Sequence, residues 1–287
     1  MPAGIRGRVP SSAPGRAPVP RIKAITFDLW DTIVHDDSDE PKRKERGLPT
    51  KRDHRRQLLW EALNRHAPIA RATVDLAFDV ADAAFNKVWR EHSITWLIGE
   101  RIQVALKGLG RTLPDADFAA LVNALGRMEI DIPPDAIPGV KDALAELSRR
   151  YRLAIVSDAI VTPGANLRKL LELHGLREYF TGFAFSDEVG HSKPHRSMFE
   201  AAARQMGVAL EEMVHVGDRD HNDVKGPQAL GMKAVLFVAT RDADRAKTSA
   251  DAICESYRDL PATIDRLAAS ESSRPTSDSG QHSAAAN

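Results

Sequence analysis

The chain has 287 residues, of which 43% are hydrophobic and 28% are charged. This composition is typical of a soluble globular protein with one large domain or two small ones. Forty basic residues balance forty acidic ones, so the net charge gives no reason to expect nucleic acid or a membrane as partner. The single cysteine, Cys254, excludes a disulfide framework and a cysteine-based metal site and favours the reducing cytoplasm. No apolar run approaches the roughly 18 to 20 residues needed to cross a bilayer.

The two ends of the chain have the composition of disordered segments. Residues 1–20 form a leader rich in proline and arginine, and residues 269–287 are mostly Ser, Ala, Gly and polar residues. Such segments have too little apolar surface to offset the entropy lost on ordering. We therefore expect the folded part of the chain to lie between them.

The first element expected is a buried strand over residues 22–27, a short apolar run rich in β-branched residues. An acidic stretch and a basic run over residues 42–56 follow, and the basic run is interpreted as a linker or an exposed helix start. From about residue 58 to 128 apolar residues recur at three- and four-residue steps, which predicts helices, with Thr73 as a possible N-cap. Residues 36–136 are thus expected to be all-helical.

Beyond Pro138 the pattern alternates between strand and helix. The expected strands cover residues 153–156, 183–185, 213–216 and 234–238, and the expected helices cover 167–173, 198–206 and 224–230. This alternation predicts an α/β fold, a doubly wound parallel (Rossmann-like) sheet with helices on both faces. Residues 21–35 and 137–268 form this core, and the all-helical segment 36–136 is then a cap inserted after the first strand.

Polar residues follow the ends of the expected strands. Asp28 follows the first strand, Ser157 ends the second, Lys193 follows the third, and Asp218 follows the fourth, with Asp223 five residues later. Any one of these aspartates is most simply a helix N-cap, and a lone lysine is most simply a surface residue. In an open parallel sheet, however, the carboxyl ends of the strands form the ligand site. Together the residues predict a carboxylate site that holds Mg²⁺, with a hydroxyl and an ammonium beside it.

The same residues resemble the motifs of the haloacid dehalogenase superfamily, hydrolases that use an aspartate nucleophile and are mostly phosphatases. Residues 27–32 (FDLWDT) resemble the first motif, Ser157 the second, Lys193 with Pro194 the third, and residues 217–223 (GDRDHND) the fourth. The resemblance covers about residues 21–268 in the order of the family, and the helical insertion matches the α-helical cap of its members. The motifs do not select a substrate.

The resemblance implies a nucleophile and a metal site. Asp28 would take the phosphoryl group as an aspartyl-phosphate intermediate, which splits one hard step into two easier ones. Mg²⁺ would be held by Asp28, the backbone carbonyl of Trp30 and Asp218, with Asp223 near or behind the ion. The expected reaction is the hydrolysis of a small phosphorylated metabolite.

The resemblance also implies a site for the phosphate. Ser157 and Lys193 would hold its oxygens, and Lys193 would offset the negative charge of Asp28. Backbone N–H groups of Leu29 and Trp30 would complete the anion cradle.

One residue departs from the pattern of the family's phosphatases. Two residues after the nucleophile they carry a second aspartate, which protonates the leaving alcohol and later activates water, whereas this chain has Trp30. The loss of such a group costs typically 10²- to 10⁴-fold in rate. The sequence therefore predicts a slow phosphatase, or one for which a group of the substrate or of the cap supplies the proton.

Two alternatives stay open at this point. The 2-haloacid dehalogenases of the superfamily also have an aromatic residue at the position of Trp30 and need no proton donor, but they work without a metal and lack an acid at the position of Asp218. The chain could also bind a phosphate ligand without hydrolysing it. We rank the Mg²⁺-dependent phosphatase first because the clustered carboxylates call for a cation.

Three further patterns are given a structural interpretation. The basic run is predicted to be a solvated helix face or linker and no nucleic-acid site. His191 and His195 have a spacing that would suit a metal on a helix, but Pro194 excludes a continuous helix there and no zinc site is predicted. Trp89 and Trp96 are predicted to be core residues of the cap. The sequence specifies neither the substrate nor the oligomeric state.

Overall fold

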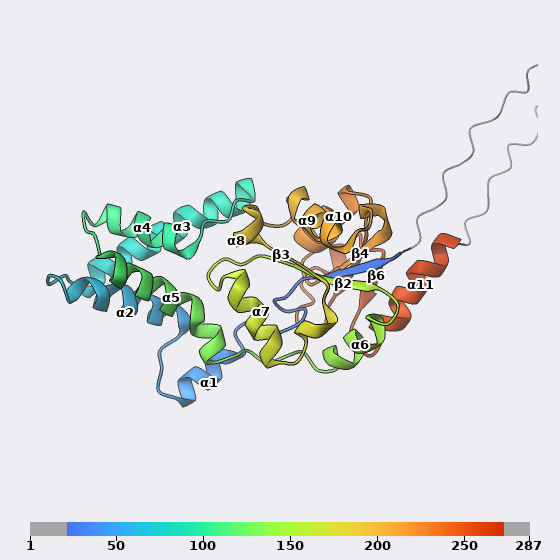
Figure 1. Cartoon of the computed structure of the whole chain (residues 1–287), viewed down its shortest axis with the longest axis horizontal. Helices are drawn as coiled ribbons and strands as arrows, with labels where there is room; N and C mark the ends of the chain where they lie inside the picture. Colours follow the sequence, from blue (N-terminus) through green and yellow to red (C-terminus); the bar gives the residue numbers. More distant parts are fainter. Residues whose placement is uncertain (1–21, 273–287) are drawn as a thin grey trace, which may run out of the picture.

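The computed structural model describes residues 22–272, and its centre is a six-stranded parallel sheet (Figure 1). The strand order is β3-β2-β1-β4-β5-β6. The strands are β1 Ala24–Phe27, β2 Arg152–Ser157, β3 Gly182–Phe185, β4 Met213–Gly217, β5 Lys233–Phe237 and β6 Ala252–Cys254. The predicted parallel sheet is confirmed, and each predicted strand lies within two residues of its observed bounds. The three-residue strand β6 was not predicted.

Both faces of the sheet are covered by helices, because neighbouring residues of each buried strand point to opposite faces. Ile25 and Phe27 pack in a cluster with α6, α7 and α11, whereas Ala24 packs in a different cluster with α9. The helices of the core are α6 Val140–Leu147, α7 Gly164–Leu173, α8 Ser186–Val189, α9 Arg196–Met206, α10 Gly226–Ala229 and α11 Leu260–Ser272. The predicted tail from residue 269 was placed too early, since α11 continues to Ser272 through residues that favour a helix.

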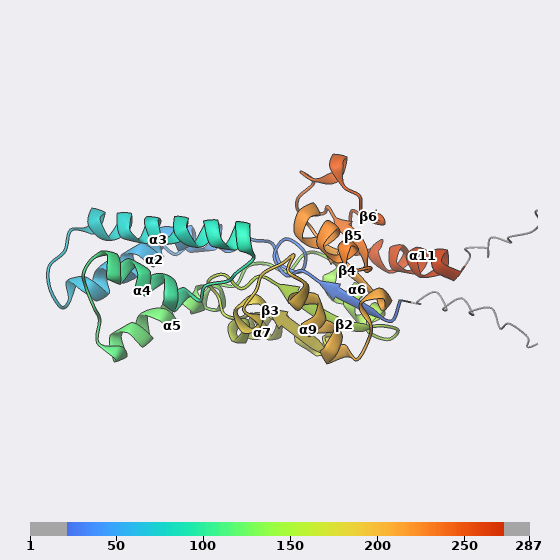
Figure 2. The ribbon, with the colours of Figure 1, turned by 90° about the horizontal axis from the view of Figure 1, so that it is seen from above.

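Between β1 and β2 the chain forms a group of helices that extends away from the sheet (Figures 1 and 2). We call residues 39–131 the helical insertion. It contains α1 Asp39–Glu45, α2 Lys51–Asn64, α3 Arg71–His92, α4 Ile98–Gly108 and α5 Asp115–Asp131. Buried residues of α2 to α5 form their own hydrophobic cluster, separate from the clusters on the sheet. The predicted N-cap at Thr73 is wrong, because the extended residue Ala70 precedes the helix and Thr73 lies within its first turn.

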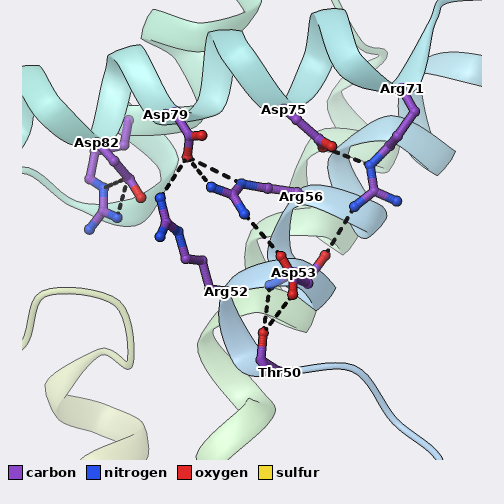
Figure 3. A network of polar contacts seen from close by, with 9 residues as sticks. Thr50, Arg52, Asp53, Arg56, Arg71, Asp75, Asp79 and Asp82 are labelled. Carbon is purple, nitrogen blue, oxygen red and sulfur yellow. Dashed lines mark hydrogen bonds and ion pairs between the residues drawn. The ribbon is translucent and has the colours of Figure 1, made fainter.

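Helices α2 and α3 are held together by ion pairs as well as by apolar packing (Figure 3). The guanidinium of Arg56 binds Asp79 of α3 and also donates to Asp53 Oδ1 at 2.9 Å. Thr50 caps α2 by accepting the N–H of Asp53 at 3.2 Å. The partners lie partly in solvent, so each pair is expected to contribute at most about 1 kcal/mol.

The interpretation of the basic run as solvated is wrong for two of its members. Arg43 is 2% exposed and donates from Nε to the carbonyl of Pro49 at 3.1 Å. Lys51 is 5% exposed, and its ammonium lies 2.9 Å from Asp39 and 3.2 Å from Glu129. A buried ammonium needs such carboxylates because burial of an unpaired charge is costly.

Within residues 22–272, no helix combines the length and the hydropathy that a membrane span requires. The segments 1–20 and 273–287, for which disorder is predicted, lie outside the described residues.

Candidate active site

The predicted site residues meet where the strand order reverses, between β1 and β4. Asp28 follows β1 directly, and its backbone N–H donates to the carbonyl of Val216 on β4 at 2.9 Å. Asp218 follows β4 directly. Ligands of doubly wound sheets bind outside the carboxyl ends of the strands at such a reversal. The topology therefore brings residues that are 190 positions apart in sequence to one edge of the sheet.

Lys193 places a positive charge at this edge of the sheet. Its buried ammonium lies 2.8 Å from Asp28 Oδ1 and 2.6 Å from Asp223 Oδ1. Although burial acts against the charged form, the carboxylates of Asp223 and Asp28 raise the pKa of Lys193 above its usual value. The lysine is thus held as an ammonium that neutralises part of the carboxylate charge.

Asp223 is fixed by three donors. Besides Lys193, His215 Nε2 lies 3.1 Å from its Oδ1, and the N–H of Arg219 donates to its Oδ2 at 3.0 Å. Burial opposes ionisation, but Lys193 and the hydrogen bond from His215 hold the pKa of Asp223 below its usual range. His215 itself is buried, which lowers its pKa, and its Nδ1 pairs with Thr26 Oγ1 at 2.8 Å. His215 was missed in the sequence, where the available signal was a polar residue inside a buried strand.

Asp218 is the carboxylate of the site without a hydrogen bond from the described residues, although the guanidinium groups of Arg219 and Arg241 lie 3.7 and 3.9 Å from its Oδ2. Among the described residues, Asp28, Asp218 and Asp223 each offer a carboxylate oxygen, and these oxygens lie within 4.8 Å of one another. Both oxygens of Asp218 are buried and have no hydrogen-bond partner. Burial, followed by the charges of Asp28 and Asp223, raises the pKa of Asp218 to about 8. A divalent cation that prefers oxygen ligands fits this donor set and would remove the unfavourable burial of charge.

Trp30 is held by a residue that follows β2. Its indole N–H donates to the carbonyl of Asp158 at 3.3 Å, and Asp158 Oδ1 accepts the backbone N–H of Lys193 at 2.9 Å. Asp158 therefore positions both the tryptophan and the lysine. Burial raises the pKa of Asp158 to about 7, although Lys193 acts in the opposite direction.

The remaining predicted phosphate ligands lie at the same sheet edge. Ser157 is the last residue of β2, and its buried hydroxyl has no partner, which leaves it available for a ligand oxygen. The side chain of Leu29 belongs to the hydrophobic core, so this residue offers only its backbone. Neither Ser157 nor Leu29 lines the cavity described below.

A family model described as "haloacid dehalogenase-like hydrolase" matches residues 22–231. The chain belongs to this hydrolase family. A similar protein is the 5-amino-6-(5-phospho-D-ribitylamino)uracil phosphatase YigB of Escherichia coli, 29% identical over 76% of this chain and 84% of the relative. The glyceraldehyde 3-phosphate phosphatase of Methanothermobacter thermautotrophicus is 37% identical, but over only 34% of this chain and 43% of the relative.

Solved structures share the fold of this hydrolase. A 2-haloacid dehalogenase from Pseudomonas syringae pv. Tomato has a TM-score of 0.59 and 23% identity over 86% of this chain and 99% of its own. A phosphatase of the same superfamily from Thermococcus onnurineus has a TM-score of 0.57 and 23% identity over 85% of this chain and 98% of its own. At this identity the likeness shows the fold and does not choose between the two activities.

A cavity of about 210 Å³ lies above Asp28 in this hydrolase. Its wall combines residues of the sheet edge with residues of the helical insertion. From the insertion come Lys51, Arg55, Trp89 and Glu129. The prediction that Trp89 is only a core residue is therefore incomplete, because it stacks on the buried Phe85 and also lines the cavity. No pattern in one sequence shows which helical residues face the sheet.

As predicted, no helix contains both His191 and His195. His195 is the N-cap of α9, which begins after Pro194, and the two imidazole rings stack with their centroids 3.9 Å apart.

Proposed function

We propose that this hydrolase is a Mg²⁺-dependent phosphatase that acts on a small phosphorylated metabolite through an aspartyl-phosphate intermediate. The observation that carries the proposal is the position of Asp28, which lies 2.8 Å from the Lys193 ammonium and beside the carboxylate of Asp218, whose oxygens accept no hydrogen bond from the described residues. A carboxylate nucleophile, a cation for the incoming phosphate and a carboxylate set for a metal are thereby combined at one edge of the sheet.

In the proposed reaction, Asp28 attacks phosphorus and the bond to the leaving oxygen breaks. Lys193 binds a phosphate oxygen and offsets the negative charge of Asp28, and the hydroxyl of Ser157 with the backbone N–H groups of Leu29 and Trp30 binds the remaining oxygens. Water then hydrolyses the acyl phosphate and restores Asp28. Mg²⁺, held by Asp28, Asp218 and the carbonyl of Trp30 with Asp223 beside it, would supply positive charge that offsets the repulsion between phosphate and carboxylate.

The helical insertion is proposed to act as a cap. It provides part of the cavity wall, so its closure would exclude water and bring its polar residues to the leaving group. We assign the cap to residues 36–136 and the catalytic core to residues 21–35 and 137–268. Arg101 of α4 donates to the carbonyl of Ile160 at 2.6 Å, a contact that joins the insertion to the loop after β2.

The named relatives support a phosphatase. YigB and the archaeal glyceraldehyde 3-phosphate phosphatases act, by their names, on small phosphate esters. Because less than half of the archaeal relatives is matched, they support the reaction class and leave the substrate unspecified. A cytoplasmic location stays a prediction.

Dehalogenation is the second candidate, favoured by Trp30 alone. It would require no cation, whereas the clustered carboxylates of Asp28, Asp218 and Asp223 call for one. Halide leaves without a proton, so the two candidates differ in their need for both a metal and an acid.

The test is one preparation assayed on a panel of phosphate monoesters and on 2-haloacids, each with Mg²⁺ and with chelator. We expect release of phosphate that chelator abolishes, and no release by Asp28→Asn. Ester cleavage that survives chelation would contradict the metal assignment. Halide release that is insensitive to chelator would establish the dehalogenase instead.

A further inference from the structure

The proposed reaction needs a proton donor that residue 30 cannot supply. When the bond between phosphorus and the leaving oxygen breaks, an alkoxide must take up a proton. The indole of Trp30 is a donor only, and its N–H is already bound to the carbonyl of Asp158. The donor must therefore come from elsewhere in the cavity.

Most carboxyl groups of the cavity have another partner. Asp28 and Asp223 share the ammonium of Lys193. Asp37 and Glu129 share the ammonium of Lys51, at 3.1 and 3.2 Å.

Asp158 is also engaged. Its Oδ1 accepts the backbone N–H of Lys193, so its carboxylate positions the lysine loop. This contact fixes the loop that carries Lys193, whereas Asp36 Oδ1 accepts only the N–H of the next residue, Asp37.

Of the cavity carboxyls, Asp36 and Asp158 form no ion pair within residues 22–272, and Asp36 is the more exposed of the two. It lies on the segment between β1 and α1, where the residue as a whole is exposed and contributes to the cavity wall. Its Oδ1 accepts the N–H of Asp37 at 3.0 Å, and its own N–H donates to Asp31 Oδ1 at 3.2 Å. This carboxyl is thus reachable from the cavity and anchored by its backbone.

The charges around Asp36 favour its protonated form. Partial desolvation at the cavity wall raises its pKa to about 6, Asp37, Glu129 and Asp31 add to the rise, and Lys51 opposes it. Arg219, which follows β4, also faces this carboxyl across the cavity. A general acid works best when its pKa lies near the operating pH.

We propose that Asp36 is the catalytic acid and base of this site. The inference rests on the proposed function. As Asp28 bonds to phosphorus and the leaving P–O bond breaks, the carboxylic acid of Asp36 gives its proton to the leaving oxygen and an alcohol departs. The Asp36 carboxylate then takes a proton from water, whose oxygen attacks phosphorus and breaks the bond to Asp28. Inorganic phosphate leaves, and Asp36 is again protonated.

The test compares Asp36→Asn with Asp37→Asn on two esters, in the full-length protein with Mg²⁺. Asp37 is the matched control, because it is the adjacent residue, lines the same cavity and pairs with Lys51. The measured quantity is kcat/KM, because it reports the steps up to departure of the alcohol and not the later hydrolysis of the intermediate, which is common to both esters. On an alkyl ester such as glycerol phosphate, Asp36→Asn should lower kcat/KM by about 10²- to 10⁴-fold. On p-nitrophenyl phosphate, whose leaving group needs little protonation, the same variant should lose at most about tenfold in kcat/KM. Asp37→Asn should change the two rates by the same small factor.

A pH profile adds a second measurement. For the alkyl ester, the wild-type rate should fall as the pH rises through about 6, where the acid loses its proton, and Asp36→Asn should lack that limb. Equal losses on both esters, or an unchanged limb, would show a structural role and overturn the proposal. A selective loss in Asp158→Asn and none in Asp36→Asn would overturn it as well. If the wild type hydrolyses neither ester, the proposed function itself fails, and Asp36 loses its role with it.

Discussion

The buried carboxylate of Asp218 should make the stability of the metal-free protein depend on pH. Its pKa is about 8 in the folded protein against 3.8 for the free group, mainly because of burial and secondarily because of Asp28 and Asp223. Between these values the folded protein holds a proton that the unfolded chain has released. The free energy of unfolding should therefore decrease as the pH rises through this window.

The magnitude follows from one proton. At 1.36 kcal/mol per pH unit, the loss attributable to Asp218 between pH 6 and pH 8 is at most about 2.7 kcal/mol. At about 2 to 4 °C per kcal/mol for a chain of this size, this corresponds to roughly 5 to 10 °C in Tm. In Asp218→Asn this contribution disappears.

The assay is thermal unfolding of the wild type and Asp218→Asn at pH 6, 7 and 8, with chelator and with Mg²⁺. In chelator, the Tm of the wild type should fall more steeply with pH than that of the variant. Mg²⁺ at about a hundred times its Kd should stabilise the wild type by about 2.7 kcal/mol and flatten its slope, because the carboxylate is then bound in its ionised form. Parallel slopes in chelator, or an equal gain of both proteins from Mg²⁺, would refute the reasoning.

Three further predictions concern Lys193, Trp30 and Phe85. Lys193→Met leaves Asp28 and Asp223 buried without their ammonium. It should therefore lower the free energy of unfolding in urea by about 3 to 5 kcal/mol and abolish turnover. A variant as stable as the wild type would contradict the ion-pair argument. Trp30→Asp should raise kcat on alkyl phosphates, and the gain should be larger in the Asp36→Asn background than in the wild type. If kcat on p-nitrophenyl phosphate rises by the same factor as on alkyl phosphates, residue 30 does not act by proton transfer. Phe85→Ala should cost about 3 to 5 kcal/mol, since the ring is 1% exposed and supports Trp89; a loss below 1 kcal/mol would contradict that packing.

The sheet could be predicted because local patterns determine it. Its buried strands are continuous apolar runs, and each polar residue of the site stands directly after such a run or a few residues later, as Asp28 and Asp218 do. The three residues of β6 could not be predicted, because a strand this short has no pattern that distinguishes it from a loop.

The part of the site that the helical insertion provides could not be predicted from the sequence. Lys51 stands in a run that has the composition of a solvated segment, and its burial depends on Glu129, 78 residues later. The role inferred for Asp36 likewise depends on which cavity carboxylates already have a cation. Such pairings are set by tertiary packing, which local composition does not encode.

Lys51 has a mechanical consequence for the molecule. Its ammonium binds Asp37, on the segment that enters the helical insertion, and Asp39 and Glu129, near the beginning and the end of the insertion. Both crossings are thereby tied to a single point. These ion pairs hold the base of the insertion together, and only the pair with Asp37 reaches outside it, so a rotation of the insertion relative to the sheet turns about a base beside the cavity while the distal ends of α3 and α4 travel furthest.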